Sequence, residues 1–165
     1  MKRLILIVHD IRSCHNVGSL LRTADGFGLE KVFLTGYTPY PASPKDNRLP
    51  HLALAQTKQI HKTALGAEET QAWAYQKDVT SLVSDLKQEG YTILALEQSG
   101  NSKSLNSYKN TADLAVVVGN EVQGLPKSVI AMCDHVLEIP MQGKKESFNV
   151  ASAAAIALYH LRLIG

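Results

Sequence analysis

The chain has 165 residues, of which 45% are apolar and 19% are charged. This length and composition indicate a compact domain with a substantial core and argue against an intrinsically disordered chain. The 17 basic and 15 acidic residues leave a formal net charge of only +2, which argues against the strongly basic class of nucleic-acid-binding domains.

Short runs of aliphatic and β-branched residues predict strands that are buried on both faces. In chain order, the expected strands are Leu4 to Val8, Val32 to Thr35, Thr92 to Leu96, Leu114 to Val118 and Val136 to Ile139. Helical patterns alternate with these strands. The alternation favours right-handed βαβ units, and therefore an α/β fold with a parallel sheet flanked by helices in one domain, residues 1–165.

The helices expected between these strands carry start and stop signals. Asn16 is a candidate N-cap for the first helix, whose apolar stripe places Arg22 on the opposite side, away from the core. The other expected helices are Thr80 to Glu89, a short helix opened by Pro126, and Asn149 to about Leu163. Residues 37–50 hold four of the six prolines and predict a long loop.

Three polar, glycine-containing segments each lie just past an expected strand. They are Asn16-Val17-Gly18-Ser19-Leu20-Leu21-Arg22, Gly119-Asn120-Glu121-Val122-Gln123-Gly124-Leu125, and Ile139-Pro140-Met141 with Ser147-Phe148-Asn149. In open α/β sheets, ligands bind beyond the carboxyl ends of the strands. The segments therefore predict one site, although capping alone also accounts for an asparagine such as Asn149.

Several other classes of site are disfavoured by the same residues. Leu125 and Pro126 follow Gly124 where a phosphate-binding loop of the Walker type needs Lys and then Ser or Thr, which argues against a nucleoside triphosphatase. No GxGxxG follows the first strand, and no GxSxG elbow is present. The six histidines show no metal-ligand spacing, so we expect no metal ion.

Cysteine usage and the N-terminus bear on location. Cys14 and Cys133 form no CxxC pattern, which favours reduced thiols and a cytoplasmic location. The N-terminal apolar run ends after Val8 and predicts a strand, not a signal peptide. No apolar stretch is long enough to span a bilayer, so we expect no membrane association.

The order and spacing of the three segments resemble the motifs of the TrmH/SpoU branch of the SPOUT RNA methyltransferases. The resemblance extends from Val8 to about Leu161, and the stretches Lys62 to Glu69 and Leu94 to Gln98 also resemble the family's central part. It implies a homodimeric α/β domain whose C-terminal part is tied in a deep trefoil knot, the SPOUT fold. Sequence rules alone would not suggest a knot, because threaded chains are rare.

The resemblance also implies a cofactor, S-adenosylmethionine, held in the knot largely by backbone groups. The residues that it assigns to the cofactor are Leu96, Gly119, Ile139, Met141, Ser147 and Phe148. Phe148 departs from the leucine that is usual between the serine and asparagine of the third motif. Because it would contact the cofactor through apolar area, we expect the change to be tolerated and to alter the packing of the adenine.

The implied reaction is methyl transfer to a ribose 2′-hydroxyl of RNA. The implied catalytic residues are Asn16, Arg22, Glu121, Ser147 and Asn149. The family gives the arginine a central role, sometimes as the base. Because a guanidinium is not deprotonated in ordinary protein sites, we expect Arg22 to hold a phosphate and stabilise the developing alkoxide. The other four would orient the ribose and Arg22.

The RNA substrate has to be inferred from other features of the chain. The chain begins at its first strand and ends with its last helix, so we expect no appended RNA-binding domain. Candidates for phosphate contacts are Arg12, Arg22, Lys45, Arg48, Lys144 and Lys145, with a solvated surface as the alternative. Size favours transfer RNA over ribosomal RNA. A non-catalytic RNA-binding protein and a knotted base-nitrogen methyltransferase stay open, although the Asn16 and Arg22 pair favours ribose chemistry.

Overall fold

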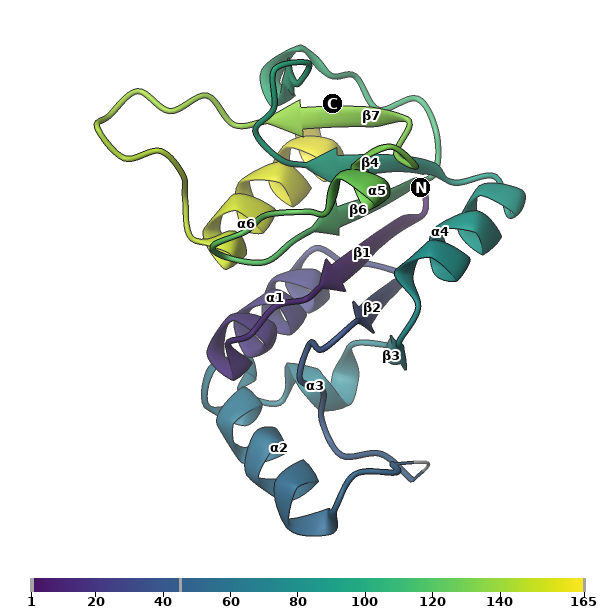
Figure 1. Cartoon of the computed structure of the whole chain (residues 1–165), viewed down its shortest axis with the longest axis vertical. Helices are drawn as coiled ribbons and strands as arrows, with labels where there is room; N and C mark the ends of the chain where they lie inside the picture. Colours follow the sequence, from purple (N-terminus) through teal and green to yellow (C-terminus); the bar gives the residue numbers. More distant parts are fainter. Residues whose placement is uncertain (1, 45, 165) are drawn as a thin grey trace.

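The computed structural model describes residues 2–44 and 46–164 (Figure 1). In this part of the chain, one sheet has the strand order β3-β2-β1-β6-β4-β7-β5, and all of its pairings are parallel. The strands are β1 (Leu4–His9), β2 (Lys31–Thr35), β3 (Trp73–Gln76), β4 (Thr92–Leu96), β5 (Lys103–Ser104), β6 (Leu114–Val118) and β7 (His135–Glu138). The expected α/β class is confirmed, while the trefoil knot stays a prediction.

Helices cover both faces of the sheet. They are α1 (Cys14–Gly26), α2 (Pro50–Ala64), α3 (Ala67–Thr70), α4 (Val79–Gln88), α5 (Lys127–Ile130) and α6 (Val150–Tyr159), with a 3-10 turn at Leu105–Ser107 and a π-helical turn at His160–Ile164. The inner strand β1 alternates between two cores: Leu4, Leu6 and Val8 pack with α1 and α6, whereas Ile5 and Ile7 pack with α4. This double burial explains the unbroken apolar runs.

The five predicted strands are all present, with ends shifted by one residue or less. Residues 38–49 contain no helix or strand in their described part, as the prolines predict, and Pro50 opens α2. The structure adds β3, β5, α2 and α3, which the apolar patterns did not indicate. None of the helices in residues 2–44 and 46–164 combines the length and apolarity that crossing a bilayer requires.

The predicted N-cap of α1 is wrong. The helix begins earlier, at Cys14, and its N-cap is Ser13, whose side chain accepts a hydrogen bond from the backbone N–H of Asn16 (3.2 Å). Serine is as good a cap as asparagine, and the stretch before Asn16 is compatible with a helical turn. Asn16 therefore lies in the first turn of α1, and its side chain is available for other contacts.

Gly18 lies where α1 packs against α2. A Cβ at this position would collide with the carbonyl oxygen of Ile60 and the hydroxyl of Thr63, so only glycine allows this close helix contact. The group that approaches Gly18 is therefore the backbone of α2, together with the Thr63 side chain. The contact fixes α1, and with it Asn16, against the rest of the domain.

Candidate functional site

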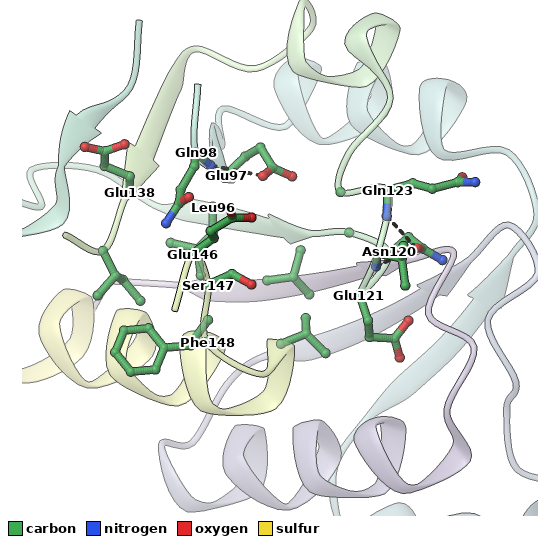
Figure 2. A pocket seen from close by; sticks show the side chains of 17 residues that line it. Leu96, Glu97, Gln98, Asn120, Glu121, Gln123, Glu138, Glu146, Ser147 and Phe148 are labelled. Carbon is green, nitrogen blue, oxygen red and sulfur yellow. Dashed lines mark hydrogen bonds between the residues drawn. The ribbon is translucent and has the colours of Figure 1, made fainter. Parts of the chain in front are cut away.

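A cavity of about 280 Å³ lies beyond the carboxyl ends of β4, β6 and β7 (Figure 2). Its walls are built by the segments that follow these strands, residues 96–98, 118–124, 138–139 and 146–148, together with the first turn of α6. The second and third motifs thus line one cavity at the edge of the sheet where α/β proteins bind their ligands.

Most of the residues assigned to the cofactor line this cavity. They are Leu96, Gly119, Ile139, Ser147 and Phe148; Met141 is the exception. Of the candidate catalytic residues, Glu121 and Ser147 are in the lining, whereas Asn16, Arg22 and Asn149 are not. The lining also includes residues to which the sequence analysis assigned no individual role in the site: Glu97, Gln98, Val118, Asn120, Val122, Gln123, Gly124, Glu138, Glu146, Val150 and Ala153.

Gly119 is required by close packing at the start of the second motif. A Cβ here would lie 2.8 Å from the backbone carbon of Gly124 and 2.8 Å from the side chain of Leu125. These distances are shorter than van der Waals contact, and one of the opposing atoms is backbone, which cannot rotate away. The turn from residue 119 to 125 therefore folds back on itself only when position 119 has no side chain.

Asn120 holds this turn together. Its Oδ1 accepts hydrogen bonds from the backbone N–H groups of Val122 (2.8 Å) and Gln123 (2.9 Å). Its Nδ2 donates to the backbone carbonyl of Asp10 (3.0 Å) and to the hydroxyl of Tyr37 (2.7 Å). The side chain is 7% exposed, so its four bonds replace those that water would make. Asn120 thus joins the second motif to the loops after β1 and β2.

Glu97 fixes the same turn from the other side. Its carboxylate accepts hydrogen bonds from the backbone N–H groups of Leu125 (2.8 Å) and Gln98 (3.0 Å). It also packs against Gly124, which has a φ of +69° and where a Cβ would collide with the carboxylate. Glu97 therefore fixes the position of the second motif relative to the end of β4 across the cavity.

One hydrogen-bond network joins all three motifs at the rim of the cavity. Asn16 Nδ2 donates to Glu121 Oε1 (2.9 Å), and Asn149 Nδ2 donates to Asn16 Oδ1 (3.1 Å). Asn149 Oδ1 in turn accepts from the backbone N–H groups of Ala151 (2.9 Å) and Ser152 (3.4 Å), which confirms Asn149 as the N-cap of α6. The predicted meeting of the three segments is therefore observed in side-chain contacts.

The orientation of both amides follows from the groups at the ends of this network. The N-terminus of α6 offers only N–H donors to Asn149, so its oxygen faces the helix and its NH₂ faces Asn16. Asn16 must then present its oxygen to Asn149 and its NH₂ to the carboxylate of Glu121. A donor and an acceptor meet at every step, and this polarity suits an ionised Glu121, both of whose carboxylate oxygens accept hydrogen bonds.

The environment of Glu121 favours that ionised form. Burial acts to raise its pKa, but the hydrogen bonds from Asn16 and from backbone N–H groups, including those of Arg12 and Ser13 (both 3.3 Å), outweigh it and lower the pKa. Glu121 therefore carries a negative charge near neutral pH and attaches the second motif to the first turn of α1.

The cavity lining carries negative charge. Four of its residues, Glu97, Glu121, Glu138 and Glu146, are acidic, and none of the described residues in the lining is Lys, Arg or His. Apolar surface is supplied by Leu96, Val118, Ile139 and Phe148. A ligand with a positive charge and a flat apolar part suits such a lining. The described residues contain no group of three or more His, Cys, Asp or Glu side chains that could hold a metal ion.

The residues predicted to contact phosphates differ in how exposed their side chains are and in whether these side chains already make hydrogen bonds or ion pairs. Arg12 and Arg22 are exposed on the loop before α1 and on α1 itself, and no hydrogen bond or ion pair joins the Arg22 side chain to the described residues. Lys144 and Lys145 are exposed on the long loop that extends from β7 to α6 (Figure 1), where they line a second hollow with Glu146 and Ser147. Lys45 lies outside the described residues.

Arg48 is mostly occupied inside its own loop. Its guanidinium donates to Asp46, to the carbonyl oxygens of Tyr40 and Pro41, and to Gln56, and its side chain is 19% exposed. The ion pair lowers the pKa of Asp46 to about 2. These contacts stabilise the proline-rich loop and leave Arg48 few donors for a phosphate.

Residues 3–159 match the model of the SpoU rRNA Methylase family. The chain belongs to this family. The match covers all three motifs and both central stretches that carry the resemblance noted from the sequence, and that family assignment is therefore confirmed.

Similar proteins place the chain within the SpoU family. It is 30% identical, over 96% of its length, to the 23S rRNA (guanosine-2′-O-)-methyltransferase RlmB of Coxiella burnetii, and 28% identical, over 95%, to a Staphylococcus aureus protein named for the TrmH family of tRNA/rRNA methyltransferases. A crystal structure of an AdoMet-bound rRNA methyltransferase from Sinorhizobium meliloti has the same fold, with a TM-score of 0.81 at 21% identity over 99% of this chain. The chain spans 57–58% of the length of these proteins.

Proposed function

We propose that this protein is an S-adenosylmethionine-dependent methyltransferase that acts on a ribose 2′-hydroxyl of RNA, with residues 1–165 as its catalytic domain. The observation that carries the proposal is the cavity at the carboxyl edge of the sheet, whose rim is tied together by the Asn16–Glu121–Asn149 network. The names of the SpoU relatives support it: the Coxiella protein is a guanosine-2′-O-methyltransferase, and the Sinorhizobium structure holds AdoMet.

The residues of the cavity fit this cofactor. S-adenosylmethionine carries a sulfonium and an ammonium group, and the four acidic side chains with no basic one favour such charges. Leu96, Ile139 and Phe148 offer apolar area to the adenine. The close turn at Gly119 exposes backbone groups to the cavity. The volume of the cavity, about 280 Å³, lies just below the range of about 300–1,000 Å³ that is usual for small-molecule sites.

When bound, the cofactor would supply an electrophilic methyl group, and the protein would supply placement and charge. Aligning the hydroxyl with the methyl can account for roughly 7–11 kcal/mol of the barrier. Ser147 lies in the lining and Asn16, Glu121 and Asn149 form the rim, so these residues would orient the ribose. The exposed Arg22 would hold the neighbouring phosphate with its planar fork of donors and stabilise the developing alkoxide.

A homodimer is part of this proposal. Ile156, Tyr159 and Leu163 are 39%, 50% and 65% exposed, and their spacing places them on one outward side of α6 and the turn that follows it. The other side of the helix is buried through Ala154, Ala157 and Leu158. Such an apolar stripe on a surface helix is typical of an interface between subunits.

The proposed substrate is RNA, with transfer RNA before ribosomal RNA; the relatives' names include both. Arg12, Lys144 and Lys145 are exposed around the cavity and would contact phosphates. A cytoplasmic location belongs to the same proposal, since such RNA is found there and both cysteines are free thiols.

The first test is calorimetric titration of the purified protein with S-adenosylmethionine. We expect saturable binding that is lost in Gly119→Val, because the added side chain displaces the turn against Gly124 and Leu125. The control is Gly143→Val: a Cβ at Gly143 meets no atom within 4 Å, and this residue is not in the lining. No binding at millimolar ligand, that is, a binding free energy weaker than about −4 kcal/mol, would favour a non-catalytic RNA-binding protein.

The second test identifies the product. The protein is incubated with S-adenosylmethionine carrying a labelled methyl group and with separate tRNA and rRNA pools, and the labelled RNA is hydrolysed with alkali. A ribose methyl blocks cleavage of the adjacent phosphodiester, so we expect the label in alkali-resistant dinucleotides. Label on a base of an ordinary mononucleotide would instead support the knotted base-nitrogen methyltransferase.

A further inference from the structure

Tyr37 is a large aromatic side chain that the structure holds at the surface. It is 56% exposed and follows directly on Gly36, after the end of β2. Its backbone N–H donates to Asp10 Oδ1 (3.0 Å), and its hydroxyl accepts a hydrogen bond from Asn120 Nδ2 (2.7 Å). The ring is thus anchored at both ends while more than half of the residue stays open to solvent.

Two residues next to Tyr37 in space or in sequence have a backbone in the left-handed region. Asp10 has a φ of +55°, which is uncommon for a residue with a side chain, and Gly36 has a φ of +66°. Gly36 also packs so tightly against the Asp10 carboxylate that a Cβ would collide with it. Backbone strain of this kind persists where the surrounding structure imposes it, and it is enriched at functional sites.

The other aromatic residue in the sequence of this loop, Tyr40, is not available in this way. Tyr40 stacks on Tyr75 with ring centroids 4.1 Å apart, and the guanidinium carbon of Arg48 lies 3.5 Å from the same centroid. Two groups this close to one ring must occupy opposite faces. Tyr40 is therefore a structural part of its loop, whereas Tyr37 is not stacked on any described aromatic ring.

Tyr37 is also adjacent to the candidate site. Its partner Asn120 lines the cavity, and the same amide group of Asn120 donates to the carbonyl of Asp10, two residues before the exposed Arg12. Val122, 83% exposed, lies on the same turn as Asn120. An exposed ring, an exposed cation and an apolar side chain thus surround one part of the cavity rim, which suits a nucleotide with its base unstacked.

We propose that Tyr37 is the stacking platform for an unpaired base of the RNA that flanks the modified ribose. This inference rests on the proposed function, because it assumes that RNA is bound at the cavity. Proteins recognise single-stranded RNA and loops by stacking splayed bases on aromatic side chains, and this interaction tolerates different bases. A ring fixed before binding loses little conformational entropy when a base stacks on it. Tyr37 thus directs the enzyme to unpaired nucleotides.

The test compares the full-length protein with Tyr37→Phe, Tyr37→Leu and Tyr37→Ala. The probes are unmodified tRNA transcribed in vitro, for affinity, and a single-stranded oligoribonucleotide containing 2-aminopurine, whose fluorescence is quenched on stacking. Phe keeps the ring and loses only the bond to Asn120, whereas Leu keeps apolar bulk without a ring. The matched control is Leu54→Ala, which removes another exposed apolar side chain (64%) on α2, a helix that contributes nothing to the described lining.

We expect Phe to bind RNA and quench the probe like the wild type. Leu and Ala should weaken RNA binding by about 5- to 150-fold, as loss of a stacked base does. S-adenosylmethionine affinity should be unchanged in all three variants and in the control. Equal RNA affinity of the wild type and Tyr37→Ala would overturn the inference. Loss of cofactor binding in both Tyr37→Phe and Tyr37→Ala would also overturn it, since the role of Tyr37 would then be only to support Asn120. If the wild type binds neither cofactor nor RNA, the proposed function itself fails.

Discussion

Asn149 has two roles in the structure, and a single substitution separates them. Its Oδ1 caps α6 through the N–H groups of Ala151 and Ser152, and its Nδ2 donates to Asn16 at the rim of the cavity. Asn149→Asp keeps an oxygen for the cap and removes the donor. Asn149→Ala removes both groups and serves as the comparison.

The two variants should differ in stability. Loss of an asparagine cap costs about 0.5–2 kcal/mol, which for a domain of this size lowers Tm by about 1–8 °C. Aspartate is as good a cap as asparagine, and its charge interacts favourably with the N-terminus of a helix. We therefore expect Asn149→Asp to have a higher Tm than Asn149→Ala, because the Asp variant loses only the contact with Asn16, whereas the Ala variant loses the cap as well.

The network nevertheless cannot survive in Asn149→Asp. The introduced carboxylate would turn an oxygen towards Asn16 Oδ1, an acceptor facing an acceptor. If the Asn16 amide turned over to donate to this carboxylate, it would present its own oxygen to the carboxylate of Glu121. Either way one contact is lost. A hydrogen bond to a charged group is worth about 1.5–3 kcal/mol, so methyl transfer should fall by about 10- to 150-fold.

Two measurements check this reasoning: thermal unfolding at pH 7, and the rate of transfer of a labelled methyl group to RNA. The expected result is slow transfer in both variants, with the higher Tm in the Asp variant, which keeps the cap. A stable Asp variant that transfers methyl groups at the wild-type rate would refute the functional role of the network and reduce Asn149 to a helix cap.

Three further outcomes follow from the packing and charges. Gly18→Ala should lower Tm by about 2–12 °C in thermal unfolding, because overpacking against Ile60 and Thr63 costs about 1–3 kcal/mol. The pKa of Asp46 is lowered to about 2, so the ion pair of Asp46 with Arg48 should stabilise the loop above about pH 4 and be lost as the pH falls towards 2. At low pH, the near-ultraviolet circular dichroism spectrum of the wild type should therefore converge on that of Asp46→Asn. Because the lining is acidic, calorimetry at low salt should show that the protein binds cationic S-adenosylmethionine more tightly than the demethylated product, which has no net charge. High salt should reduce this difference in affinity.

The parts of the fold that could be predicted from the sequence are those with strong local signals. β1 and β6 are continuous runs of buried aliphatic residues, so their identity does not depend on distant contacts. The polar motifs that follow such strands were expected to meet because all parallel strands end at one edge of the sheet. The cofactor residues themselves were assigned by the resemblance to the TrmH/SpoU family; five of these six line the cavity, and their binding role stays a prediction.

The elements that were missed have weak or misleading patterns. In α2, Leu49, Leu52 and Leu54 at or near its start are exposed, and the buried face consists only of Ala53, Ile60 and Ala64. The large apolar residues thus lie off the buried face and hide the helical period. β3 is half-buried along its whole length and β5 has only two residues, so neither contains an apolar run.

The hydrogen bonds by which Glu97 and Asn120 hold the site together could not be predicted, for a different reason. The contact of Glu97 with Leu125 spans 28 positions, and that of Asn120 with Tyr37 spans 83. Nothing local to either residue indicates its partner. A buried asparagine with four hydrogen bonds and a loop asparagine with none look the same in a sequence, and only the tertiary fold distinguishes them.

Asn16 illustrates how a local rule can fail and still leave the site intact. Because Asn16 precedes an apolar helical pattern, the sequence predicts it as the N-cap of α1. In the structure the N-cap is Ser13, three residues earlier. The consequence is functional, because a capping Asn16 would use its oxygen for backbone N–H groups and have none for Asn149. Since Ser13 satisfies the helix end, Asn16 can donate to one motif and accept from another. The network across the rim therefore depends on where the helix begins, which is set by position 13, outside all three motifs. Glycine is also tolerated at an N-cap, so Ser13→Gly, which weakens the cap by only a few tenths of a kcal/mol, should keep this helix start and the network.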